Sequence, residues 1–264
     1  MQDGVTHQLL EMGIDSTWND NNEFEVWDGE ARCHGFGQSI AIKHIRPVMP
    51  LLMMRASMEA QQRFAPQKRP YLISRSGCAG MQRYVQTWSG DNRTSWETLR
   101  YNTRMGLGMS LSGLYNVGHD VGGFSGDKPD AELFVRWVQN GVMHPRFTIH
   151  SWNDDQTVNE AWMYPGVTPA IRSAIELRYR LLPYLYTLLW QATPTMSRCC
   201  DQRSSIMNTI RKPLKSAMIS CWGAICWSPA SSNRTSVSAG CGCRKTAPAG
   251  TIFIAGSGSP LASG

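Results

Sequence analysis

The sequence predicts an α/β protein that forms part of a (β/α)8 barrel, and three observations support this class. Strand-like pieces alternate with helical ones over residues 1–196, which is typical of a mostly parallel sheet. Polar side chains follow several of the strand-like pieces, at the ends where such barrels carry their active sites. About four βα units can be counted whereas a complete barrel needs eight, so we expect the chain to begin inside the barrel.

The first predicted elements are two strands separated by a long helix. A short helix over residues 6–12 leads into a strand that ends at residues 18–20. The stretch from Val48 to Phe64 has methionine and leucine spacing that predicts a helix. The second strand is expected at Tyr71-Leu72-Ile73-Ser74.

The run Thr94-Ser95-Trp96-Glu97 marks the start of the next helix. It matches the capping box, in which a hydroxyl accepts a hydrogen bond from a free backbone N–H and a Glu three residues later reciprocates. Asp91 therefore lies in the loop just before a helix. We expect a third strand near residues 112–117, a helix over about residues 131–140 and a fourth strand near residues 146–150.

A long helix ends the predicted barrel region. Thr168-Pro169 places a hydroxyl cap and a first-turn proline ahead of it, and the helical pattern continues to about Trp190. Because a proline inside a helix removes one backbone hydrogen bond, we expect a kink at Pro183.

Charge and cysteine content limit the partners and the compartment. The formal net charge is +6, but residues 197–264 hold eight basic residues and one acid, so residues 1–196 are close to neutral. Residues 1–196 contain only Cys33 and Cys78, which indicates a reducing compartment. The first residues lack a secretory pattern, and no apolar run approaches the ~20 residues of a membrane helix. We therefore predict a cytoplasmic protein that binds neither nucleic acid nor membrane.

The last part of the chain has a different character. Residues 197–264 show no sustained period of 2 or 3.6, and they are rich in serine and cysteine. We therefore predict two parts, a partial (β/α)8 catalytic barrel over residues 1–196 and an irregular tail over residues 197–264.

Two aspartates flanked by tryptophan are the candidate catalytic residues. Asp20 lies in the run Trp18-Asn19-Asp20-Asn21-Asn22-Glu23, and Asp91 lies in the run Trp88-Ser89-Gly90-Asp91-Asn92. A glycosidic bond is usually cleaved by one carboxylic acid that protonates the leaving oxygen and one carboxylate opposite it. Two carboxylates beside aromatic side chains therefore indicate sugar cleavage.

Four polar side chains should meet at one face of the barrel, because each follows a strand-like run. They are Asp20, Arg75, Asp120 and His150. The carboxyl ends of the strands form the active-site face of a (β/α)8 barrel. We therefore expect these four residues to surround the same site.

Five motifs occur in order over residues 13–192: Gly13–Glu23, Arg69–Ser76 with Trp88–Asn92, Val117–Phe124, Pro145–His150 and Arg178–Tyr186. Together they resemble the later part of the barrel of glycoside hydrolase family 31, the family of α-glucosidases and α-xylosidases. The first two resemble its nucleophile and acid/base segments. The others resemble its glycine-rich segment, its histidine-bearing segment and the helix that closes the barrel.

The resemblance implies a role for each candidate residue. Asp20 corresponds to the nucleophile and Asp91 to the proton donor, which implies a retaining mechanism through a covalent glycosyl-aspartate. We expect Trp88 to shield Asp91 from water. Sugar-binding roles are implied for Trp18, Arg75, Trp88, Asp120, Phe124 and His150.

Some features depart from the family pattern. Asn21 stands where methionine is common, and Glu160-Ala161-Trp162 stands where a proline commonly follows the glutamate. Family members also carry a β-sandwich and further sugar-binding strands before this region, which we expect this chain to lack. They continue into a strand-rich domain after the barrel. Residues from about 197 lack that pattern, so we hypothesise a shifted reading frame there, which translation of the coding DNA in the other two frames would test.

Other kinds of site fit the sequence less well. The glycines over residues 118–123 do not follow the G-x-G-x-x-G nucleotide pattern. Nothing beyond residue type supports a thiol nucleophile at Cys78 with His150, and Asp20-x-Asn22 lacks the glycine of a calcium loop. The tail cysteines do not form paired zinc knuckles. We therefore expect no cofactor and no metal ion.

The leading hypothesis is a retaining, exo-acting α-glycosidase, α-glucosidase-like, that acts on an oligosaccharide or α-glucoside. Two alternatives stay open, an inactive truncated fragment of such an enzyme and a non-catalytic carbohydrate-binding module. A sheet of four units would leave open edges, so we also expect self-association.

Overall fold

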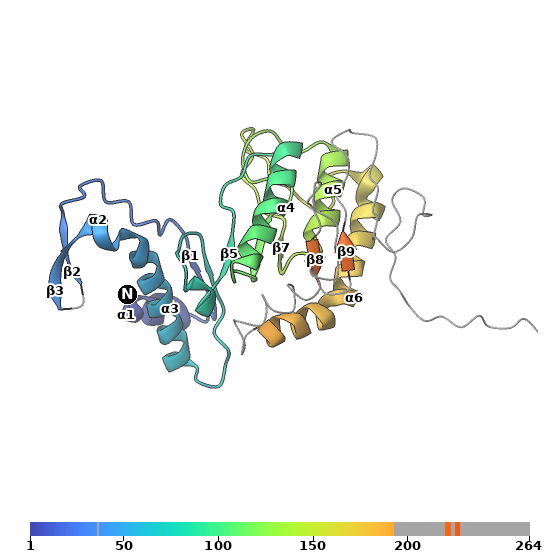
Figure 1. Ribbon diagram of the computed structural model, residues 1–264. Helices are drawn as coiled ribbons and strands as arrows, with labels where there is room; N and C mark the ends of the chain where they lie inside the picture. The colour runs from blue at the N-terminus through green and yellow to red at the C-terminus, as the bar shows by residue number, and fades with distance from the viewer. Residues whose placement is uncertain (36, 193–219, 223–224, 228–264) are drawn as a thin grey trace, which may run out of the picture. The chain divides into compact units, whose positions relative to one another are not determined.

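The computed structural model describes residues 1–35, 37–192, 220–222 and 225–227. The chain divides into two compact units, Met1–Ile206 and Met207–Gly264. The first unit contains the sheet, the helices and the candidate site (Figure 1).

A parallel five-stranded sheet in the order β1-β4-β5-β6-β7 forms the centre of the first unit. Its strands are β1 Thr17–Asn19, β4 Leu72–Ser74, β5 Gln86–Trp88, β6 Val117–Asp120 and β7 Arg146–Thr148. Neighbouring strands follow one another along the sheet in chain order, as in a (β/α)8 barrel. The predicted fold class, a partial barrel of the α/β type, is confirmed.

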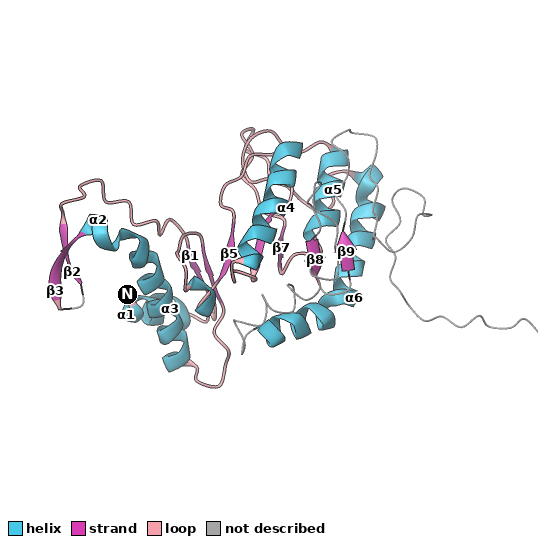
Figure 2. Ribbon diagram, in the orientation of Figure 1, coloured by secondary structure: helices cyan, strands magenta, loops and turns pink. Residues whose placement is uncertain are grey.

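Helices connect most of these strands (Figure 2). α3 packs against β1 and β4, α4 against β6, and α5 against β7 and α6. Their bounds are α3 Met49–Phe64, α4 Trp96–Leu111, α5 Ala131–Gly141 and α6 Thr168–Ala192. The connection from β4 to β5 is different, because it holds only the 3-10 turn η3 Met81–Arg83.

Shorter elements surround this framework. An antiparallel hairpin of β2 and β3 lies between β1 and α3 in the chain, outside the five-stranded sheet. The short elements are α1 Gln2–Val5, η1 Thr6–Leu10, β2 Arg32–Gly35, β3 Gln38–Ala41, α2 Ile42–Ile45, η2 Arg46–Val48 and η4 Pro165–Val167.

Apolar side chains hold the helices on the sheet. Met54 of α3 and Leu72 of β4 are almost fully buried in one cluster with Met81 and Val85. The inward face of α5, which includes Phe134 and Trp137, is also fully buried. Burying a large apolar side chain contributes roughly 1.5–3 kcal/mol, so these contacts stabilise the layer that supports the strand ends.

Most predicted elements are found close to their expected bounds. The third strand was expected near residues 112–117, but β6 begins at Val117 because Ser112 caps the end of α4 and a turn follows. β5 and the hairpin of β2 and β3 were not predicted. The helix α6 contains Pro183, and Figure 1 shows it bending between its yellow first part and its orange last part, as predicted.

The described residues include no helix that is both long and apolar enough to cross a membrane. In the second unit, β8 Ser220–Trp222 and β9 Ile225–Trp227 form an antiparallel pair. The rest of the predicted tail, residues 197–264, lies outside the described residues.

Candidate active site

Each of the five parallel strands delivers a polar side chain to the carboxyl edge of the sheet. Asp20 follows β1, Arg75 follows β4, Asp91 follows β5, Asp120 ends β6 and His150 follows β7. Side chains alternate between the two faces of a strand, so residues two apart share a face. This places Trp18 on the same face as Asp20, and His150 on the same face as Arg146, the first residue of β7.

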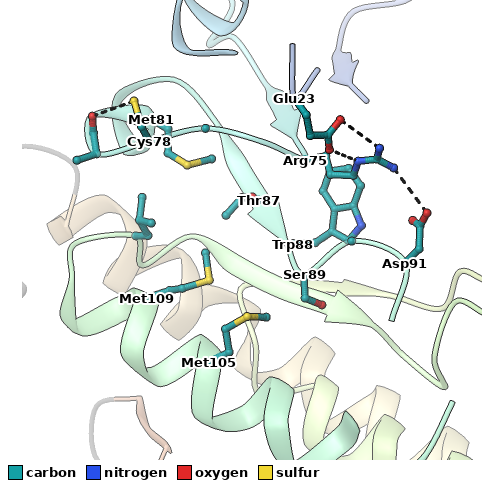
Figure 3. Close-up of a pocket in the computed structure, with 14 residues that line it drawn as sticks. Glu23, Arg75, Cys78, Met81, Thr87, Trp88, Ser89, Asp91, Met105 and Met109 are labelled. Carbon is teal, nitrogen blue, oxygen red and sulfur yellow. Dashed lines mark hydrogen bonds and ion pairs between the residues drawn. The ribbon is translucent and has the colours of Figure 1, made fainter. Parts of the chain in front are cut away.

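Arg75 is the centre of a cluster of charges (Figure 3). Its Nη1 atom lies 3.4 Å from an Asp20 oxygen and 3.6 Å from an Asp91 oxygen. Its Nε and Nη2 atoms donate to the two Glu23 oxygens at 2.6 and 3.2 Å. Nη2 also donates to Asn21 at 2.7 Å. One guanidinium therefore contacts three carboxylates from two loops.

The two aspartates predicted to be catalytic are close together. Because one oxygen of each lies near the same Arg75 nitrogen, at 3.4 and 3.6 Å, these two oxygens are separated by no more than about 7.0 Å. Retaining glycosidases need about 5–5.5 Å between the carboxyl groups, and inverting enzymes about 6.5–9.5 Å. The arrangement is within reach of a single sugar.

The loop that carries Asp20 is fastened to the end of β4. Asn21 has a positive φ of 49°, a conformation that asparagine tolerates better than most residues. Asn22 is buried, donates to the Ser74 hydroxyl at 2.9 Å and accepts from the Ser76 backbone N–H at 3.1 Å. These bonds place Asp20 beside Arg75. Asn21, the residue that departs from the family pattern, therefore has two roles here: it adopts the positive φ of the loop and it accepts a hydrogen bond from Arg75.

The loop that carries Asp91 is fastened to the loop after β6. The Ser125 hydroxyl donates to the Asp91 carbonyl at 3.2 Å, and the Phe124 N–H donates to the Asn92 carbonyl at 2.8 Å. Gly123 lies so close to Thr94 that a Cβ would be 2.4 Å from its hydroxyl. The glycine allows the two loops to meet, which explains the glycine-rich run before Phe124.

Aromatic rings line the face between the charged groups. Trp18 and Trp88 meet edge to face at 4.9 Å between ring centroids. His150 lies 6.0 Å from Trp18 and 5.3 Å from Phe124. Flat rings of this kind offer apolar surface to the C–H groups of a pyranose.

One expectation about Asp91 is wrong. Its side chain is 52% exposed, although Trp88 is buried, so Trp88 does not shield it from water. The Asp20 side chain is similarly accessible, at 47%. Both carboxylates are thus open to a ligand.

Asp120 is much less available than expected. It is 1% exposed, and one of its oxygens accepts two hydrogen bonds of 3.0 Å from the equally buried Arg146. Burial raises the pKa of Asp120, while the Arg146 guanidinium opposes that shift. Its second oxygen has no hydrogen-bond partner among the described residues. This oxygen is buried as well, so Asp120 presents no acceptor at the surface of the site.

Glu23 and Arg75 influence each other's ionisation. The hydrogen bonds from Arg75 lower the pKa of Glu23, and those to Glu23 raise the pKa of Arg75. Both groups therefore stay charged at neutral pH, which keeps a full positive charge beside Asp20 and Asp91.

Three residues of the site were missed from the sequence: Asn21, Glu23 and Arg146. Asn21 and Glu23 lie in the same run as Asp20, so their closeness to Asp20 in the sequence could have indicated that they belong to the site. Arg146 is two and four residues before Thr148 and His150 in a predicted strand. The strand period of two would have placed it on the face of His150.

A cavity of about 590 Å³ opens beside the charged cluster (Figure 3). Glu23, Arg75 and Asp91 line one side of it, and two methionines of α4, Met105 and Met109, line another. Asp20 does not line it. The cavity therefore extends toward the helix layer at the helix-free β4–β5 connection and is not the space between the two aspartates.

No cluster of three or more potential metal ligands occurs among the described His, Cys, Asp and Glu residues. The site is instead built from carboxylates, one guanidinium and aromatic rings.

Comparison with known proteins identifies the family. The model of the glycosyl hydrolases family 31 TIM-barrel domain matches residues 1–188. The chain belongs to glycoside hydrolase family 31. The motif resemblance found in the sequence is thereby confirmed.

Several known proteins are similar to this chain. Alpha-glucosidase 2 of Bacillus thermoamyloliquefaciens is 33% identical over 208 residues, which cover 73% of this chain and 25% of that protein. Neutral alpha-glucosidase AB of Homo sapiens is 36% identical over 184 residues, covering 66% of this chain and 19% of that protein. The crystal structure of a family 31 α-xylosidase from a soil metagenome, complexed with xylose, matches with a TM-score of 0.66 and 26% identity. That match covers 74% of this chain and 32% of the xylosidase chain.

The chain therefore spans about a quarter or less of the length of these curated relatives. The residues that the family model matches, 1–188, include Asp20, Arg75 and Asp91.

Proposed function

We propose that this chain carries the catalytic residues of a retaining, exo-acting α-glycosidase, α-glucosidase-like in its substrate. The observation that carries the proposal is the contact of Asp20 and Asp91 with the same Arg75 nitrogen, which brings two carboxylates within reach of one sugar. Similarity to alpha-glucosidases supports the choice of substrate, an oligosaccharide or an α-glucoside. The free cysteines Cys33 and Cys78 fit the proposed cytoplasmic location.

In this proposal Asp20 attacks the anomeric carbon and forms a glycosyl ester, while Asp91 gives its proton to the leaving oxygen. Asp91 then takes a proton from the incoming water, which releases the sugar from Asp20. Arg75 contacts both carboxylates through one nitrogen and so holds them on the same side of its guanidinium. Water can reach both aspartates, since each side chain is about half exposed.

The remaining site residues would bind the terminal sugar. His150 can form hydrogen bonds with hydroxyl groups, and the rings of Trp18 and Phe124 can contact the pyranose C–H groups. Asp120 and Trp88 are buried, so their proposed part in sugar binding is to support these side chains. All of these side chains lie at the carboxyl edge of the sheet.

The test is hydrolysis of α-glucosides by the purified chain and by Asp20→Asn and Asp91→Asn. We expect Asp20→Asn to abolish turnover. Asp91→Asn should lower kcat/KM by about 10²–10⁴ for poor leaving groups, and less for nitrophenol, which needs little protonation. Asp15→Asn, an exposed aspartate in the same segment, is the matched control. Nuclear magnetic resonance of the first sugar released should show the α-anomer.

The two alternatives predict other results. A carbohydrate-binding module would bind glucose without turnover and without dependence on Asp20. An inactive fragment would show no turnover, either in the original chain or in Asp20→Asn and Asp91→Asn. Release of the β-anomer would contradict retention.

A further inference from the structure

Arg146 is a buried residue that contacts Trp18, Trp88 and Asp120 of the candidate site, although no motif assigned it a role. It is the first residue of β7 and its side chain is only 2% exposed. Its guanidinium lies 5.4 Å from the Trp18 ring centroid and 5.6 Å from that of Trp88. The two rings lie 4.9 Å apart, so a single cation contacts both members of the aromatic pair.

The same guanidinium fixes Asp120. Two of its nitrogens donate to one oxygen of this carboxylate at 3.0 Å, which leaves the other oxygen without a partner among the described residues. A planar group held by two N–H bonds has little freedom to rotate. Both bonds end on the same oxygen, so the position of that Asp120 oxygen depends on Arg146.

The sheet provides the space for this contact. Gly118 pairs in register with Trp88 on one side and with Arg146 on the other. A Cβ on Gly118 would lie 2.0 Å from the Arg146 carbonyl oxygen and 2.6 Å from the Arg146 Cβ. Because Gly118 has no side chain, the guanidinium can pass over β6 and reach the indole of Trp88.

We propose that Arg146 is a positioning residue of the sugar site, which holds Trp18, Trp88 and Asp120 in the arrangement that a bound pyranose requires. This inference rests on the proposed function for its ligand. Burying an ion pair is costly, and apolar residues of similar size often stabilise a fold as well or better. What an apolar residue could not do is orient a carboxylate and two ring faces together.

The experiment compares the full chain with Arg146→Met and measures two properties. The first is the far-ultraviolet circular dichroism signal that arises from coupling between the indoles of Trp18 and Trp88. The variant Trp18→Phe, which should lack this signal, assigns it to the pair. The second is the Kd of the glucose-configured iminosugar deoxynojirimycin. We expect Arg146→Met to lose the indole signal and to bind the iminosugar at least about tenfold more weakly, because a hydrogen bond involving a charged group is lost.

Arg178→Met is the matched control. Arg178 is another partly buried arginine that lies 5.3 Å from a ring, that of Phe147, but its hydrogen bonds are to backbone carbonyls before β7. This variant should keep the indole signal and the affinity. If Arg146→Met does not fold, Arg146→Lys is measured in its place, since lysine keeps the charge but cannot donate in parallel or cover both rings.

The proposal is overturned if a folded Arg146 variant keeps the indole signal and binds within roughly twofold of the original affinity. Equal losses in the Arg178 control would also overturn it. If the original chain binds no iminosugar, the proposed function fails, and the indole signal alone still decides whether Arg146 orients the rings.

Discussion

Arg75 shows how one residue can organise a site through its hydrogen-bonding geometry. Glu23 accepts from Nε and Nη2, which fixes the plane of the guanidinium and leaves Nη1 facing Asp20 and Asp91. A paired guanidinium is a more rigid partner than a lysine ammonium would be. The distance between the two aspartates thus depends on a third acid that takes no part in the proposed reaction.

Glu23→Gln should therefore reduce activity without removing a reacting group. The amide cannot accept on both atoms, so Arg75 loses one of its two bonds and moves more freely. We expect kcat/KM for an α-glucoside to fall by about tenfold, the loss of one charge-assisted bond. Steady-state kinetics measures this, with Glu25→Gln, an exposed glutamate nearby, as the control. Equal rates for Glu23→Gln and the original chain would show that Arg75 is positioned in another way.

At the scale of elements, the start of α4 shows how tertiary contacts compete for a capping residue. The capping-box pattern predicted Thr94 as the cap, but Ser95 caps the helix and accepts from the Thr98 N–H at 3.0 Å. The Thr94 hydroxyl instead donates to the Gly122 carbonyl at 3.0 Å. The loop after β6, distant in the sequence, therefore takes over the hydroxyl that the local pattern assigned to the helix.

The two hydroxyls should consequently give different results when removed. Ser95→Ala should lower the free energy of unfolding by about 0.5–2 kcal/mol, the usual cost of losing an N-cap. Thr94→Ala should cost about 1 kcal/mol and should loosen the Asp91 and Phe124 loops instead. Urea unfolding gives the two free energies. Hydrogen exchange of the Thr98 amide shows which variant has lost the helix cap, because this amide donates to the capping hydroxyl of Ser95. Faster exchange of Thr98 in Thr94→Ala alone would restore the original prediction.

At the scale of the whole molecule, two buried histidines, one in β6 and one just before β7, make stability depend on pH. His119 and His144 meet edge to face at 5.4 Å. Burial lowers the pKa of His144 to about 4, with a further contribution from Arg178, and burial lowers the pKa of His119 as well. Both are therefore neutral in the folded protein over most of the pH range.

The sign of the effect follows from proton uptake. An unfolded histidine takes up its proton near pH 6.5, and His144 in the folded protein does so only near pH 4. As the pH falls through this window the unfolded state binds more protons, so stability that is present above about pH 6.5 is progressively lost. For His144 the loss is roughly 3 kcal/mol by pH 4. Urea unfolding should show a smaller loss for His144→Gln than for the exposed control His34→Gln, and an unchanged pH slope would contradict this.

Self-association stays a prediction for the molecule as a whole. In the described sheet, β1 and β7 each have a hydrogen-bonded neighbour on one side only. Unpaired strand edges bind other edges, so we expect the apparent mass to rise with protein concentration. Light scattering after size-exclusion chromatography measures this. A monodisperse, cooperatively melting monomer would contradict the expectation.

Much of the fold could be read from the sequence, because it depends on local patterns. The helix from Met49 to Phe64 and the helix from Ala131 to Gly141 have apolar spacing that repeats over several turns, and both were predicted closely. β5 was not predicted, because two of its three residues, Gln86 and Thr87, are polar although all three are buried. Its place is decided by its neighbours β4 and β6, which pair with it on both sides.

The candidate site divides in the same way. The sequence by itself determined the barrel class, the family, the strand ends that carry Asp20 and Arg75, and the place of Asp91 in the loop before a helix, because these depend on residue type and spacing along the chain. Only the tertiary structure decided that Glu23 fixes Arg75, and that Arg146 joins Trp18, Trp88 and Asp120. The physical reason is that these contacts depend on strand register and on the crossing of side chains between separate strands. No local pattern contains that information.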